Sequence, residues 1–280
     1  MTSLALFRRH GWTVSPLAAL CIAVIAFWVV VAMLAPLLVR YPTGEIVDYE
    51  FFGPMTATTW LGTDYLGRDI YSRVIYGARL TIGISLAGTV LAAVPGITLG
   101  MLAAVIGGWF DAVLSRFLDA FVGIPQLLLA LVLVAAGGSS IPMLIGVIAI
   151  TFGPSCYRFA RALALDVQAM DFVTAARARG EGSVYLIRAE ILPGIMAPLL
   201  ADQGLIFVKS VLMMSGLSFL GLGVQPPQAD WGGLVRENMM GLSYLAPAVI
   251  VPSIAIVSLT LSINLLIDSL PTRIKDREPQ

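Results

Sequence analysis

The chain has 280 residues, of which 58% are apolar and 12% are charged, with a mean hydropathy of +0.90 and no net charge at neutral pH. Soluble domains carry about a quarter charged residues, so this composition excludes an ordinary soluble globular protein. The zero net charge also gives no indication of nucleic-acid binding. We therefore expect an all-α, polytopic membrane protein forming a single transmembrane domain over residues 1–280.

Four uncharged runs are long enough to span a membrane: 11–39, 80–110, 120–157 and 238–267. A bilayer core of about 30 Å needs about 20 helical residues. The third run is long enough for two passes, and Gly137-Gly138-Ser139-Ser140 marks a turn within it. A fifth pass lies between Ile191 and Gly223. We predict six membrane helices, at about 17–39, 80–106, 113–136, 141–160, 194–220 and 245–268.

Orientation follows from the positions of Lys and Arg, which are retained on the cytoplasmic side. With both termini inside, eleven basic residues face the cytoplasm and five face outward. This bias predicts cytoplasmic termini, an outer loop over 40–79 and a cytoplasmic loop over 161–193. The inside group comprises Arg8, Arg9, Arg116, Arg158, Arg161, Arg177, Arg179, Arg188, Arg273, Lys275 and Arg277, and the outside group comprises Arg40, Arg68, Arg73, Arg79 and Arg236.

Reactive chemistry is not indicated. Cys21 and Cys156 fall inside predicted helices, where buried free thiols are expected, and one histidine cannot build a metal site. The two lysines, Lys209 and Lys275, do not follow a glycine-rich turn, so the chain carries no P-loop for ATP. We expect no catalytic residues, no bound metal and no cofactor on this chain.

The outer loop contains LGTDYLGRDIYSRVIYGARLTI, residues 61–82. Asp64 with Arg68, and Asp69 with Arg73, are spaced i, i+4, which predicts ion pairs on an amphipathic helix at the outer interface. The functional interpretation of these four residues is an outer vestibule, and the alternative is a purely structural interface helix.

The cytoplasmic loop contains DFVTAARARGEGSVYLIRAEILP, residues 171–193. Its alanine-rich first part predicts a short helix, which Gly180 would end. Small side chains could let this helix enter a groove of another protein, and Pro193 suits the first turn of the next helix. The alternative is an ordinary basic loop. The residues singled out for coupling to a partner are Asp171, Thr174, Ala175, Ala176, Arg177, Arg179, Gly180, Leu192 and Pro193.

Within the fifth helix, Asp202 and Lys209 are seven residues apart and share one face. Ionisable side chains at membrane depth normally face a cavity or a partner. We therefore assign Asp202 and Lys209, together with Met214, to a translocation path or to the interface with a partner permease. After this helix, LSFLGLGVQPPQADWG, residues 217–232, predicts a stiff turn at Pro226-Pro227 and an interface anchor at Trp231.

Together the 61–82, 171–193 and 217–232 segments resemble the dipeptide, oligopeptide and nickel branch of the ABC-importer permeases, in order and over essentially the whole chain. Three positions depart from the family pattern, at Thr174, Glu190 and Met214.

The resemblance implies the type I importer permease fold in a bacterial inner membrane. It also implies alternating access and four kinds of partner: a homologous second permease, two ABC ATPases that bind ATP and Mg²⁺, a periplasmic binding protein, and the lipid bilayer. Peptide is the expected cargo, with nickel as the alternative. A secondary transporter and a membrane-anchored structural subunit are the rival classes, although no internal repeat supports the first.

Overall fold

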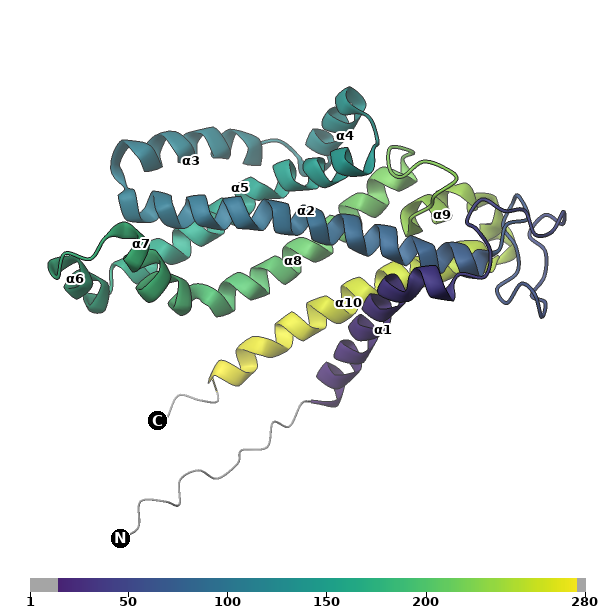
Figure 1. Ribbon diagram of the computed structural model, residues 1–280, viewed down its shortest axis with the longest axis horizontal. Coiled ribbons are helices and arrows are strands. Elements are labelled where there is room, and N and C mark those ends of the chain that lie inside the picture. The colour runs from purple at the N-terminus through teal and green to yellow at the C-terminus, as the bar shows by residue number, and fades with distance from the viewer. Residues whose placement is uncertain (1–14, 276–280) are drawn as a thin grey trace, which may run out of the picture.

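The computed structural model describes residues 15–275, with side chains described for 15–269, and the elements form an elongated helical bundle (Figure 1). Arg8, Arg9 and Arg277, which were counted in the charge bias, lie outside the described residues. The elements are α1 (Pro16–Leu38), α2 (Ile70–Ile106), α3 (Gly108–Val122), α4 (Gln126–Gly137), α5 (Ile141–Gln168), α6 (Asp171–Ala178), α7 (Ser183–Tyr185), the π-helix η1 (Leu186–Ile191), α8 (Leu192–Phe219), α9 (Trp231–Glu237), the 3-10 helix η2 (Met239–Tyr244) and α10 (Pro247–Lys275).

Within residues 15–275, five helical stretches are long and apolar enough to cross a membrane: α1, α2, α5, the continuous stretch from α7 to α8, and α10. The span expected over 113–136 is wrong as a single helix. It consists of α3 and α4, which meet at 87° across Gly123–Pro125. Pro125 has no backbone N–H and restricts Ile124 to extended conformations, so a helix cannot continue through it.

The start of α2 also differs from the sequence expectation. Instead of a separate interface helix before residue 80, the chain enters α2 at Ile70, where the Asp69 side chain accepts the N–H of Ser72 and caps the helix. Residues 61–69 are turns and isolated bridges. At about 1.5 Å per residue, α2 is about 55 Å long and exceeds the hydrocarbon thickness by nearly twofold.

Small residues hold α2 against α5 along most of their length. Gly88, Ala92, Gly96, Gly100 and Ala104 recur every four residues on one buried face of α2. A β-carbon added at Gly96 would lie 2.8 Å from the carbonyl oxygen of Gly153, and one at Gly100 would lie 2.5 Å from that of Tyr157. Glycine at these positions therefore permits close backbone approach, the packing mode that membrane helices favour.

The bundle has two distinct ends (Figure 1). Residues 39–69, α9 and η2 gather at one end, and α6 and α7 lie at the other. Helix α1 runs along α10, where the Trp28 indole N–H donates to the Ser258 hydroxyl at 2.9 Å.

The expected loop over 161–193 is largely helical, because α5 continues to Gln168 and α7, η1 and α8 form one stretch from Ser183.

Candidate functional site

Helix α6 is seated on the bundle by two apolar side chains. Val173 and Ala176 are both 0% exposed and belong to a core cluster with Met101, Ala160 and Leu186. The expectation that Ala176 enters a partner's groove is therefore wrong, since its side chain is occupied by the chain's own core. Its small size lets α6 lie close against α5 and η1.

The opposite face of α6 is open to the surroundings. Asp171, Thr174, Ala175, Arg177 and Arg179 are all exposed, as the coupling interpretation requires. Large apolar side chains accompany them, and the sequence analysis did not single these out: Met170, Phe172, Val184 and Tyr185. We call these nine exposed residues, together with exposed Ala178, the α6 surface.

Gly180 ends α6 as the sequence predicts. Its φ is +85°, and its N–H donates to the carbonyl of Arg177 while the N–H of Glu181 donates to that of Ala176. This is a Schellman arrangement, in which a left-handed residue closes the helix. The Arg179 side chain then lies 3.9 Å from both Glu181 and Glu190, which places a loose ion network beside the turn.

Pro193 lies in the first turn of α8, as the sequence predicts. What the sequence did not indicate is that the π-helix η1 runs directly into α8 without a break. A proline ring clashes with the carbonyl four residues earlier and removes one hydrogen bond. The widened π-turn at Leu186–Ile191 immediately before Pro193 accommodates that clash within a continuous helix.

The three residues assigned to a translocation path do not share one environment. Lys209 is exposed and Asp202 is half-buried on α8. Met214 is 0% exposed within a core cluster beside Ile206 and Leu217, so its assignment to the path is wrong. Lys209 lies within a candidate membrane span, where a charged side chain normally faces a cavity or a partner.

At the end of the bundle opposite α6, the structure forms a buried ion cluster from Asp64, Arg68, Arg73 and Glu237. Asp64 Oδ2 accepts from Arg68 Nε at 2.7 Å and pairs with Arg73. Glu237 Oε2 binds Arg68 at 2.6 Å and Arg73 at 2.9 Å. Two acids and two guanidinium groups thus neutralise each other, and Arg73 is only 1% exposed.

This geometry confirms the pair Asp64 and Arg68 and corrects the pair Asp69 and Arg73. Asp69 caps α2, whereas Arg73 reaches Asp64 and Glu237. Burial by itself lowers the pKa of the Arg68 guanidinium, but the charges of Asp64 and Glu237 outweigh it and raise that pKa. The cluster is therefore a structural joint that ties the 39–69 segment to α2 and α9, not an exposed vestibule surface.

Trp231 is likewise part of this joint, and its assignment as an interface anchor is wrong. It is 0% exposed, its indole N–H donates to the carbonyl of Val74 at 3.0 Å, and its backbone N–H donates to Thr81 Oγ1 at 3.1 Å. The 61–82 and 217–232 segments, far apart in sequence, meet here.

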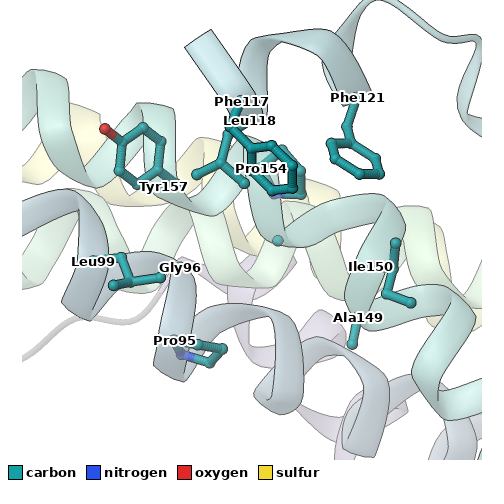
Figure 2. Close-up of a pocket in the computed structure, with 11 residues that line it drawn as sticks. Pro95, Gly96, Leu99, Phe117, Leu118, Phe121, Ala149, Ile150, Pro154 and Tyr157 are labelled. Atoms are coloured by element: carbon teal, nitrogen blue, oxygen red, sulfur yellow. The ribbon is translucent and has the colours of Figure 1, made fainter. Parts of the chain in front are cut away.

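A second polar joint attaches α3 to α5. Arg161 binds Asp111 through Nε and Nη2, both at 2.5 Å, and Tyr157 contacts Ser115 at 2.8 Å. Beyond it, an apolar cleft of about 280 Å³ separates α3 from α2 and α5, with Phe117 and Phe121 on one side (Figure 2). From the sequence, Arg161 was predicted only as a cytoplasmic charge.

Taken together, these features define a multi-pass membrane bundle with an exposed surface helix at one end and a buried ionic joint at the other. Residues 96–276 match the family model described as "Binding-protein-dependent transport system inner membrane component", and the chain belongs to this family. It is a multi-pass inner-membrane protein of a transport system that includes other subunits.

Related permease proteins align with this chain over most of its length. It is 32% identical to a glutathione transport system permease protein GsiD of Pectobacterium atrosepticum, over 94% of this chain and 86% of the relative. It is 32% identical to a dipeptide transport system permease protein DppC of Alkalihalophilus pseudofirmus (91% and 84%) and 36% identical to a putative peptide transport system permease protein of Brucella suis (96% and 89%).

The fold is similar to that of a solved amino acid ABC transporter chain. The TM-score is 0.51 at 20% identity, with 73% of this chain and 93% of that chain covered. Together with the family match, this likeness confirms the expected helical fold of an importer permease.

Proposed function

We propose that this chain is a pore-forming permease of an ATP-driven importer for di- or oligopeptides, and that the α6 surface receives the motion of an ATPase subunit. The observation that carries this proposal is the contrast between the two faces of α6. Buried Val173 and Ala176 fix the helix to the bundle, while Phe172, Ala175 and Arg177 point outward. A rigidly seated helix with an apolar and cationic outer face suits a groove on a partner protein.

The complete importer then contains a homologous second permease, two ABC ATPases that hold ATP and Mg²⁺, and a periplasmic binding protein. The α6 end faces the cytoplasm, as do both termini, and the 39–69 segment faces the periplasm. Closure of the ATPases on ATP opens the outer gate, and hydrolysis resets it. The ATPases drive this cycle only by their differential affinity for the two states of the permease.

Exposed Lys209 and half-buried Asp202 lie on the path or on the face that meets the second permease. Peptide is favoured over nickel as cargo because relatives over most of the chain are named as peptide, dipeptide or glutathione permeases. In addition, residues 15–269 contain no group of three side chains that could hold a metal ion.

The test is co-purification of the tagged chain with its ATPases from native membranes, followed by an assay of ATP hydrolysis stimulated by peptide-loaded binding protein. Ala175→Trp enlarges the exposed face of α6, and we expect it to release the ATPases and abolish stimulation. The matched control is Ala57→Trp, the same change at an exposed position at the opposite end.

Retention of the ATPases by the Ala175→Trp variant would refute coupling through α6. ATP-independent peptide uptake by that variant would instead assign the chain to the secondary transporters, and a chain that purifies alone and transports nothing would leave only a structural subunit.

A further inference from the structure

A polar cavity of about 370 Å³ lies where the 61–82 and 217–232 segments meet, at the end of the bundle opposite α6. This cavity is separate from the α6 surface and from the face of α8 that carries Asp202 and Lys209. Its volume falls in the range of small-molecule sites, about 300–1,000 Å³. The lining residues are Tyr65, Ser218, Gly221, Val224, Gln225, Pro226, Gly233, Arg236 and Glu237, and we call it the Arg236 cavity.

The Arg236 guanidinium lies against the turn that follows α8. Gly221 has a φ of +87°, and a β-carbon there would lie 2.8 Å from the guanidinium carbon of Arg236, so this group packs closely on the backbone of the turn. The Gln225 side-chain amide donates to the carbonyls of Gly221 at 3.2 Å and Gly223 at 2.8 Å, which fixes the turn. Arg236 itself is exposed, so its guanidinium is accessible to a ligand.

Arg236 carries the uncompensated charge of this cavity. Within the described part of the chain, no carboxylate lies within 4 Å of its guanidinium, whereas Arg68 and Arg73 are neutralised by Asp64 and Glu237. Glu237 also lines the cavity, and its ion pairs use Oε2 and not Oε1. An unpaired cation and a carboxylate oxygen that is not committed to an ion pair therefore line the same cavity.

One wall offers a further polar group. Ser218 is 3% exposed and lines the cavity, and its buried hydroxyl faces the Asp230 carboxylate. This wall is therefore polar but already partnered within the protein, and the charged groups that line the cavity are Arg236 and Glu237.

We propose that the Arg236 cavity binds the free α-carboxylate of a short peptide, with the Arg236 guanidinium as its ionic partner. This proposal rests on the proposed function as a peptide importer. A planar guanidinium pairs with both oxygens of a carboxylate, and Oε1 of Glu237 is an acceptor for the peptide's ammonium group. The cavity volume of about 370 Å³ is larger than one acidic side chain of a docked binding protein would fill, which favours a small molecule.

The experiment measures the binding of alanyl-alanine to the purified importer without its binding protein, by calorimetry. The comparison ligand is alanyl-alanine amide, which lacks the carboxylate. Because a hydrogen bond to a charged group is worth about 1.5–3 kcal/mol, we expect the amide to bind at least about tenfold more weakly. Arg236→Gln should weaken binding of the acid by a similar factor and remove the discrimination between the two ligands.

Arg79→Gln is the matched control, since Arg79 is exposed on α2 and does not line the cavity. Equal binding of acid and amide by the unaltered importer, or unchanged discrimination in Arg236→Gln, overturns the proposal. So does an Arg236→Gln variant with normal peptide binding that needs more binding protein to stimulate ATP hydrolysis, because Arg236 would then contact that protein. Failure of the importer function appears separately, as ATP hydrolysis that peptide-loaded binding protein does not stimulate even in the unaltered complex.

Discussion

Asp64→Asn tests whether the buried ion cluster holds the bundle together. Asparagine keeps the side-chain oxygen that accepts the N–H groups of Leu66 and Arg68, at 2.8 and 2.9 Å, so the turn itself can persist. The substitution removes the charge facing Arg68 and Arg73, which are 5% and 1% exposed. Two buried guanidinium groups then share only Glu237.

The expected loss follows from the geometry. With charge centres about 4 Å apart and an effective dielectric constant of about 20, each ion pair is worth about 4 kcal/mol before desolvation is subtracted. Removing one partner of a buried pair costs about 3–5 kcal/mol, because it leaves a buried charge uncompensated. We therefore expect Asp64→Asn to destabilise the protein by about that amount.

The assay is thermal unfolding of the purified protein in detergent, followed by loss of the monodisperse peak in size-exclusion chromatography. Glu45→Gln, an exposed acid in the same segment, is the control. The double variant Asp64→Asn with Arg68→Met restores charge balance and should recover part of the loss. An Asp64→Asn protein as stable as the Glu45→Gln protein would refute the reasoning.

Three further predictions follow from single contacts. Ala176→Leu should lower the free energy of unfolding by about 1–3 kcal/mol, because the larger side chain overpacks the contact between α6 and the bundle. Ala175→Leu at the exposed face should leave the unfolding temperature unchanged, and equal effects of the two substitutions would contradict the burial of Ala176. Arg161→Met, which breaks the two bonds to Asp111, should increase proteolysis in the α2–α3 turn, and a cleavage rate equal to that of the unaltered chain would show that α3 is held otherwise. Burial raises the pKa of Asp230 from 3.8 to about 6, so protonation of this carboxyl stabilises the folded state. That stabilisation is fully present below about pH 4 and is lost as the pH rises through about 6. The Asp230→Asn variant should lack that part of the pH dependence in unfolding measurements at pH 5 and 7.5, and an unchanged pH slope would exclude Asp230 as its source.

Hydropathy and turn residues were enough to predict most of the membrane helices. The expected 17–39 and 194–220 agree with α1 (Pro16–Leu38) and α8 (Leu192–Phe219) within two residues at each end. The break between α3 and α4 was missed because Gly123-Ile124-Pro125 lies inside an uninterrupted apolar stretch, although the proline was the available signal. The early start of α2 was interpreted as a separate interface helix, because charged residues interrupt the hydropathy pattern before residue 80 although the helix itself is continuous.

Local spacing predicted the partner of Arg68 but not the rest of the cluster. Asp64 is four residues from Arg68, a separation that helix or turn geometry brings together. Glu237 lies 169 residues from Arg68, and only the packing of α9 against α2 joins them. Met214 and Ala176 were predicted to face a pore and a partner's groove, but both side chains are buried in the core. The sequence of one helix does not indicate which of its faces the neighbouring helices cover.

Helix α2 extends from the ionic joint to the seat of α6. Its first turns hold Arg73 in the cluster, and its last turns contribute Met101 and Ala104 to the apolar cluster that holds Val173. Glycines on its buried face bring α2 into close backbone contact with α5. At a length of about 55 Å, a tilt of about 5° moves one end of α2 by about 5 Å relative to the other. In the proposed coupling, a small rotation delivered at α6 therefore becomes a displacement of several ångströms at the ionic joint.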